Sequence, residues 1–192
     1  KDFALPIKPI NLNGFEETVD FNYSIWKKNN VRSHKVSGYS IVNISLTKLG
    51  AAPGDATSEQ MRILADLADE YSASELRTTK RQTIVFPYVR KDQVFDLWQS
   101  LERYGLASPH QGTLAQIVAC PGGDYCDLAK AVSIPIATRV QQRFDDMDKL
   151  LDIGDLNINI SGCENSCAHH HVADIGLLGM QKTGEEYYQI TL

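Results

Sequence analysis

The four cysteines of this 192-residue chain constrain its fold most strongly, because they fall into two closely spaced pairs. Cys120 and Cys126 enclose a loop with adjacent glycines in a C-x5-C pattern, and Cys163 and Cys167 form a C-x3-C pattern. A step of four residues places the second pair on one face of a helical turn. The glycines let backbone N–H groups of the first loop approach a bound group closely. We therefore expect the four thiolates to converge on one centre.

Composition limits the partners and the compartment. A net charge of −5 and a pI near 5.5 provide no broad positive field, so we expect neither a nucleic acid nor a membrane as partner. No stretch approaches the roughly 20 apolar residues of a membrane span. The chain begins at Lys1 without Met or an apolar signal segment, so we expect a cytoplasmic location and a piece of a longer protein.

An iron–sulfur cluster is the centre that this cysteine spacing favours. A cluster with four thiolate ligands carries negative charge, so N–H groups at loop and helix starts, such as those after Cys126, would stabilise it. Structural zinc is an alternative, although the C-x5-C pair is wider than the usual zinc pairs. Free or disulfide-paired thiols are another alternative, and a reducing cytosol disfavours the disulfides.

The first part of the chain predicts an arm followed by a strand. Residues 1–30 carry scattered apolar positions that are interrupted by Pro6, Pro9 and Gly14, so we expect an extended arm or linker there. Apolar and polar residues then alternate, which predicts a strand over 39–47.

Residues 31–111 predict a small α+β unit that is compatible with a ferredoxin-like fold. Thr57 and Gln60 form a capping box in front of helically spaced apolar residues, so we expect a helix over 58–71. Short strands are expected over 76–78 and 82–86, around a basic turn, and a second helix from Val94 ends before Gly105. This order of elements is α+β.

Residues 112–192 predict a second, mixed α/β domain. We expect a glycine loop at 120–126, then a helical stretch to about residue 150 that Pro135 interrupts. Strands are expected over 156–161 and 174–178, on either side of the second cysteine pair.

Two segments of the second domain resemble a known family. Residues 119–129 (ACPGGDYCDLA) and 160–177 (ISGCENSCAHHHVADIGL) resemble the two cluster signatures of the assimilatory sulfite and nitrite reductases. Residues 75–83 (ELRTTKRQT) resemble the basic strand-turn of that family's ferredoxin-like half-domain. The resemblance covers about residues 30–180 and departs at Glu164, where the family usually has Pro. The side chain at this position is not a ligand, so the departure leaves the cysteine assignment intact.

The resemblance implies a ferredoxin-like half-domain followed by a truncated domain that binds sirohaem and a [4Fe–4S] cluster. It implies that all four cysteines ligate the cluster and that Cys167, the last of them, also bridges to the sirohaem iron as the catalytic ligand. Arg77, Lys80 and Arg81 match the family's basic segment and are candidates for binding sirohaem carboxylates. The alternative for them is a solvated basic turn. A second basic cluster, formed by Arg32, His34 and Lys35, could also face cofactor or substrate, but a solvated surface is the favoured interpretation.

The implied activity is the six-electron reduction of sulfite to sulfide, with nitrite to ammonia as the alternative. A ferredoxin or a flavoprotein would donate the electrons, and the N-terminal half of the same protein would supply the cations that face the substrate. We expect the present piece to be inactive alone. Two other hypotheses stay open, namely a non-catalytic zinc- or cluster-stabilised module and a redox sensor or electron carrier with a cluster and no haem.

We expect structural roles for the three adjacent histidines and the two tryptophans. Adjacent residues of a helix point in different directions, so His169, His170 and His171 are not expected to face one ion together. We expect them to be partly packed and partly exposed. Trp26 and Trp98 are expected to be anchors in the core or linker.

Overall fold

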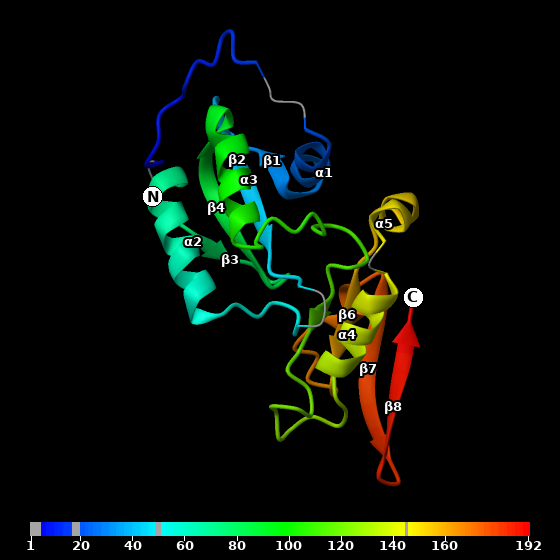
Figure 1. The fold of residues 1–192 in the computed structure, drawn as a ribbon. Helices are drawn as coiled ribbons and strands as arrows, with labels where there is room; N and C mark the ends of the chain where they lie inside the picture. The colour runs from blue at the N-terminus through cyan, green and yellow to red at the C-terminus, as the bar shows by residue number, and fades with distance from the viewer. Residues whose placement is uncertain (1–4, 17–19, 49–50, 145) are drawn as a thin grey trace. The chain divides into compact units, whose positions relative to one another are not determined.

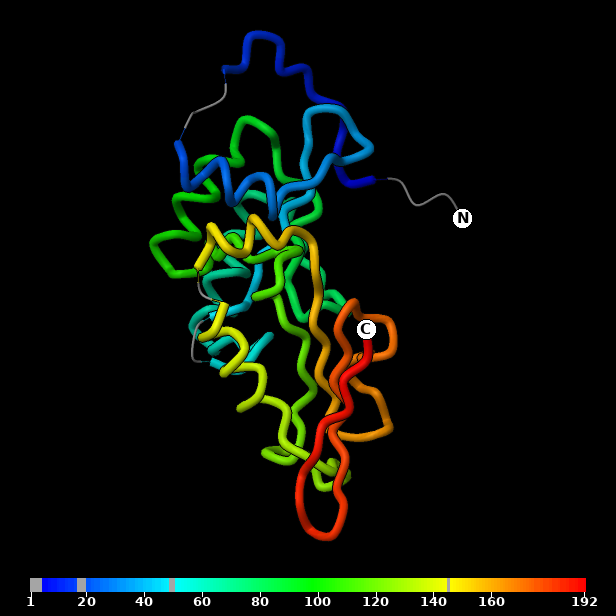
Figure 2. Tube along the Cα trace, turned by 90° about the vertical axis from the view of Figure 1, so that its right-hand side faces the viewer, coloured from blue at the N-terminus to red at the C-terminus, as the bar shows by residue number. Residues whose placement is uncertain are grey.

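The computed structural model describes residues 5–16, 20–48, 51–144 and 146–192 (Figure 1). The chain divides into two compact units, the first comprising Lys1–Leu46 and Ala56–Pro109 and the second comprising Thr47–Asp55 and His110–Leu192. Each unit has its own four-stranded sheet and its own hydrophobic core. The two units are therefore described separately. The trace of each can be followed by residue colour in Figure 2.

The first unit is built on an antiparallel sheet with the strand order β1-β2-β4-β3. Its strands are β1 (Val31–Ser33), β2 (Tyr39–Ser45), β3 (Arg77–Thr78) and β4 (Thr83–Arg90). Its helices are α1 (Phe21–Asn30), α2 (Ser58–Tyr71), the short η1 (Lys91–Gln93) and α3 (Val94–Arg103). Buried residues of the three α-helices and of the two central strands form one core, among them Trp26, Val42, Leu64, Phe86 and Leu97. The helices therefore pack on the sheet.

The structure contains the two helices and the strand that local sequence patterns predict for this unit. Thr57 and Gln60 form the capping box at the start of α2, which confirms the helix over 58–71. The strand expected over 39–47 is β2, and the helix that begins at Val94 is α3. Trp26 and Trp98 are both buried in the core, as expected.

The expected extended arm is wrong over Phe21–Asn30, which form α1. Asp20 caps this helix, because its carboxylate accepts the Tyr23 N–H at 2.8 Å. Tyr23 and Trp26 bury their rings one turn apart, and these two aromatics are too few to give a clear periodic pattern. Residues 5–16 contain no helix or strand, and the arm residues 1–4 and 17–19 lie outside the described part of the chain.

The second unit has a mixed sheet with the strand order β5-β6-β7-β8. Its strands are β5 (Val118–Ala119), β6 (Ile158–Ser161), β7 (Ile175–Lys182) and β8 (Glu185–Thr191). The first three are parallel, and β7 and β8 form an antiparallel hairpin. The helices are α4 (Ile134–Arg143), α5 (Met147–Ile153) and the short η2 (His170–Val172).

Pro135 does not interrupt a helix, which corrects the sequence expectation. It lies in the first turn of α4, where its missing N–H has no helical partner to lose. The expected helical stretch instead divides between α4 and α5. Among the helices that the structure describes, none is long and apolar enough to cross a membrane.

Candidate metal centre

Parallel pairing of β5 with β6 brings the two cysteine pairs together. Ala119 lies opposite Ile160, and both strands end at the same edge of the sheet. Cys120 follows β5 directly, and its N–H donates to the Ile160 carbonyl at 3.0 Å. Gly162 and Cys163 follow β6 directly. The first cysteine of each pair therefore leaves the sheet beside the other.

A direct hydrogen bond joins the two pairs at this edge. The Gly162 N–H donates to Cys120 Sγ at 3.1 Å, and Ser133 Oγ lies 3.4 Å from the same sulfur. Hydrogen bonds to the sulfurs of a cluster help to set its reduction potential, so an N–H directed at Cys120 Sγ suits a sulfur that holds one.

Residues 130–133, here called the bridging segment, fasten the two cysteine loops to each other. The Lys130 and Ala131 N–H groups donate to the Gly162 carbonyl at 2.8 and 3.1 Å. The Ala131 carbonyl accepts the Gly123 N–H at 3.0 Å from within the first cysteine loop. The bridging segment therefore contacts the first loop on one side and the second loop on the other.

Two glycines make this close packing possible. A Cβ at Gly162 would lie 2.7 Å from the Ala131 carbonyl oxygen, and one at Gly122 would lie 2.5 Å from the Ser133 nitrogen. Gly122 also has a φ of +64°, in the left-handed region that favours glycine. Any larger residue at either position would push the bridging segment away from the cysteine loops.

The β7–β8 hairpin also holds the bridging segment, through two hydrogen bonds to Val132. Tyr188 Oη donates to the Val132 carbonyl at 2.7 Å, and the Val132 N–H donates to Glu186 Oε2 at 3.2 Å. Burial, with the Glu186 carboxylate beside the hydroxyl, raises the pKa of Tyr188 to about 12. The phenol therefore stays protonated and keeps donating at any physiological pH.

The four cysteines form no disulfide and differ in exposure. Cys163 is buried, Cys120 and Cys126 are half-buried, and Cys167 is exposed. The helical turn expected over the second pair is wrong, because Ser166 has a φ of +56° and the segment forms a turn closed by the Ser166 N–H on the Cys163 carbonyl at 3.2 Å. Nor does a helix start after Cys126, where a tight turn brings the Ala129 N–H to the Cys126 carbonyl.

Among the described residues, no three His, Cys, Asp or Glu side chains are placed to hold one metal ion together. An iron–sulfur cubane does not require such convergence, because each thiolate binds a different iron atom. Soft thiolates on two loops joined at one sheet edge, with an N–H directed at Cys120 Sγ, form a donor set that fits a cluster of this kind.

The three adjacent histidines are divided as the sequence predicts. His170, the first residue of η2, is buried, and its Nδ1 lies 3.2 Å from Ser166 Oγ, whereas His169 and His171 are exposed. Burial lowers the pKa of His170, with a smaller contribution from the neighbouring His171. The His170 side chain thus supports the turn between Cys163 and Cys167.

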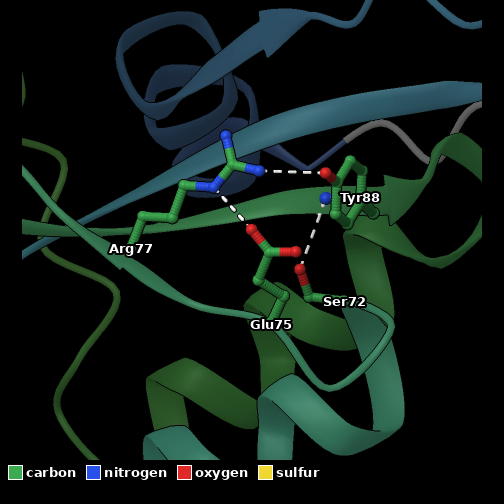
Figure 3. Close-up of polar contacts among 4 residues, drawn as sticks. All are labelled: Ser72, Glu75, Arg77 and Tyr88. Carbon is green, nitrogen blue, oxygen red and sulfur yellow. Dashed lines mark hydrogen bonds and ion pairs between the residues drawn. The ribbon is translucent and has the colours of Figure 1, made fainter. Parts of the chain in front are cut away.

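The predicted basic residues belong to the first unit. Arg77 projects from β3, and its guanidinium contacts Glu75 Oε1 at 2.6 Å and Tyr88 Oη at 2.9 Å (Figure 3). The Tyr88 N–H in turn donates to Ser72 Oγ at 3.3 Å. Hydrogen bonding to Glu75 raises the pKa of Arg77. The Arg77 side chain remains 56% exposed, so its charge is accessible to a second carboxylate.

The other candidate cations are at the surface or pack locally. Lys80 is exposed and Arg81 is half-buried in the turn between β3 and β4. Arg32 is exposed and donates from its guanidinium to the Lys28 carbonyl at the end of α1. His34 packs edge-on against Tyr88, with ring centroids 5.6 Å apart.

Sequence reasoning missed Ser133, Gly162, Glu186 and Tyr188, which position the cysteine loops. Only Gly162 carried a signal, because it directly precedes Cys163 in the sequence. The other three reach the loops through tertiary contacts between segments far apart in the chain.

Comparisons with known proteins agree with this architecture. Residues 43–104 match the nitrite/sulfite reductase ferredoxin-like half domain, and residues 112–192 match the nitrite and sulphite reductase 4Fe-4S domain. The chain is 31% identical over 140 residues to sulfite reductase [ferredoxin] 2 of Mycolicibacterium paratuberculosis, covering 70% of this chain and 25% of the relative. It is 28% identical over 186 residues to the chloroplastic ferredoxin–nitrite reductase of Spinacia oleracea, covering 94% of this chain and 30% of the relative.

A solved structure shares the fold. The Mycobacterium tuberculosis NirA protein superposes with a TM-score of 0.65 at 23% identity, covering 96% of this chain and 32% of that one. The α+β fold, with a ferredoxin-like half-domain followed by a mixed cluster-binding domain, is thus confirmed.

The fold and the cysteine site define a 4Fe-4S domain preceded by a ferredoxin-like half-domain. The chain belongs to the sulfite and nitrite reductase family, whose cofactors are sirohaem and a [4Fe–4S] cluster. It spans about a quarter to a third of the length of these relatives.

Proposed function

We propose that this chain is the cluster-bearing part of a sirohaem-dependent reductase, with Cys120, Cys126, Cys163 and Cys167 as the cluster ligands. The observation that carries the proposal is the Gly162 N–H donating to Cys120 Sγ, since it joins the two cysteine pairs at one sheet edge. The family match over residues 112–192 supports it.

The chain's own residues would hold and tune the cluster. The Gly162 N–H stabilises charge on Cys120, and the bridging segment keeps the two loops in register. Cys167, the exposed thiol, is the residue that we assign to the bridge between cluster and sirohaem iron. When bound, the two cofactors supply the electron transfer and the substrate-binding iron. Arg77, Lys80 and Arg81 are the proposed contacts of sirohaem carboxylates, because their cations suit carboxylate ligands.

We propose sulfite as the substrate of the complete protein, reduced by six electrons to sulfide, with nitrite reduced to ammonia as the alternative. Ferredoxin-dependent relatives of both kinds match this chain, and they support a ferredoxin as the electron donor. The partner within the same protein is its N-terminal half. A cytoplasmic location fits this chemistry, because a reducing compartment keeps the cysteines available to iron.

The rates of sulfite and nitrite reduction, measured with the complete, anaerobically purified protein, distinguish the two candidate substrates. Reduced methyl viologen replaces the natural donor, and sulfide and ammonia are measured separately. A kcat/KM that is higher for sulfite than for nitrite supports the proposed substrate. The reverse ratio assigns nitrite, and stoichiometric zinc without iron would reject the reductase assignment in favour of a zinc-stabilised module.

A further inference from the structure

Ser133 is the last residue of the bridging segment and directly precedes α4, yet its hydroxyl does not cap that helix. A serine at this position usually accepts the N–H of the second or third helical residue. Here the second residue is Pro135, which has no N–H, and the Ser133 side chain makes no capping hydrogen bond to the described residues of α4. The hydroxyl of Ser133 is therefore available for another role.

The Ser133 hydroxyl lies instead beside the sulfur of Cys120. Its Oγ is 3.4 Å from Cys120 Sγ, which is hydrogen-bonding distance for an oxygen–sulfur pair. Ser133 is fully buried, so bulk water does not compete for the hydroxyl. The Gly162 N–H reaches the same sulfur at 3.1 Å. Cys120 Sγ thus has two polar neighbours that come from different segments of the chain.

The packing around Ser133 holds the hydroxyl in this position. The Ser133 carbonyl accepts the Ala137 N–H at 3.0 Å, which fixes the residue to the first turn of α4. A Cβ at Gly122 would lie 2.7 Å from Ser133 Oγ, and one at Gly162 would lie 3.1 Å from it. The hydroxyl therefore lies between the two cysteine loops, in a space that exists because both of these residues are glycine.

The direction of this hydrogen bond follows from the state of Cys120. When the cysteine is a thiol, either atom of the pair can donate. A cysteine that ligates iron has no proton on its sulfur, so the Ser133 O–H donates and Cys120 Sγ accepts. This step rests on the proposed function, which makes Cys120 a cluster ligand. Both neighbours of the sulfur, the Ser133 O–H and the Gly162 N–H, are then donors to it.

We propose that Ser133 is a positioning residue that raises the reduction potential of the cluster by donating a hydrogen bond to Cys120 Sγ. Hydrogen bonds to the sulfurs are one of the factors that set the potential of an iron–sulfur cluster. An electron taken from the donor protein adds negative charge to the cluster and its sulfurs, so the Ser133 O–H stabilises the reduced form more than the oxidised form. The proton stays on the Ser133 oxygen throughout, and no bond forms or breaks there.

Potentiometric titration of the complete, anaerobically purified protein tests this role, with reduction of the cluster followed by EPR. Ser133→Ala removes one buried oxygen and should shift the reduction potential to a more negative value. The expected shift is up to about 59 mV, which is a tenfold change in a one-electron equilibrium constant. Ser133→Thr keeps the hydroxyl and should have a potential closer to that of the unaltered protein. Loss of the cluster from both variants would assign Ser133 to packing alone and overturn the inference.

Ser40→Ala is the matched control, because it removes the same atom from another buried serine, which lies on β2 of the first unit. It should leave the potential of the cluster unchanged. An unchanged potential in Ser133→Ala, or an equal shift in Ser40→Ala, would overturn this inference while the cluster assignment stands. Stoichiometric zinc in place of a cluster in the unaltered protein would overturn the proposed function and this inference together.

Discussion

The second pair of cysteines shows how far neighbouring residues can differ in environment. Cys163 is 7% exposed and lies two residues after the end of β6, whereas Cys167 is exposed beyond the turn that Ser166 introduces. A buried thiolate can reach only the group enclosed by its own loops. An exposed one can also bind a second cofactor. Exposure thus agrees with the role that we propose for Cys167.

The bridging role of Cys167 is testable by comparing two variants of the complete protein. Cys167→Ser should abolish the electronic coupling between cluster and haem iron in Mössbauer or EPR spectra, together with catalysis, because it removes the shared ligand. Cys163→Ser removes a cluster ligand alone and serves as the comparison. If Cys167→Ser retains the coupling while Cys163→Ser destroys it, the bridge belongs to Cys163.

Arg77 and Arg81 can be tested as sirohaem ligands through cofactor content. The exposed Arg77–Glu75 pair contributes at most about 1 kcal/mol to stability, so a cofactor carboxylate can displace it. Changing both arginines to Ala should lower sirohaem content, measured by visible absorption of the complete protein, and largely spare its thermal midpoint. Arg62→Ala, at an exposed position of α2, is the control. Unchanged sirohaem content in the double variant would identify the turn as solvated surface.

At the scale of elements, the β7–β8 hairpin positions the cysteine loops through two hydrogen bonds to Val132. Tyr188→Phe removes the donor of the 2.7 Å bond and leaves the Val132 carbonyl without it. We expect a loss of about 1 kcal/mol in the free energy of unfolding, measured by urea denaturation. The complete protein should also lose iron faster to a chelator.

Tyr187→Phe provides the control for this prediction. Tyr187 neighbours Tyr188 on the same strand, but its hydroxyl donates to the exposed Glu185 at 2.7 Å and does not contact the bridging segment. Tyr187→Phe should therefore leave iron retention unchanged. Equal iron loss in the two variants would show that the hairpin does not act through Val132.

The start of α2 offers an independent test of an element predicted from sequence. Thr57 Oγ1 accepts the Gln60 N–H at 3.1 Å, and Gln60 Oε1 accepts the Thr57 N–H at 2.9 Å. Thr57→Ala should lower the free energy of unfolding by about 1 kcal/mol, and Thr57→Ser should largely restore it. Thermal denaturation measures both, and equal midpoints for the two variants would contradict a capping role for the hydroxyl.

Helices and strands that carry a pattern in their own sequence were predictable, whereas those that form through contacts with other segments were not. The capping box identified α2, and alternation identified β2, because both patterns lie within a few residues. β8 has no buried face to give it an alternating pattern, and β5 has only two residues. The cysteines of the site were found from their spacing, whereas Ser133 and Tyr188 contact the site from distant segments and give no local signal.

At the scale of the whole molecule, the chain combines two units with separate cores and separate candidate roles. The first holds the basic segment, and the second holds the cysteines. The central claim concerns the second unit, because it requires both cysteine loops to bind one iron–sulfur cluster.

Metal and sulfide analysis of the complete, anaerobically purified protein tests this claim most directly. It should find about five iron atoms for every four acid-labile sulfides, four from the cluster and one from sirohaem, with visible absorption from both cofactors. Changing Cys120 or Cys163 to Ser should remove the cluster absorption, because each is a ligand from a different loop. Stoichiometric zinc without iron, or cluster absorption that survives both changes, would contradict the claim.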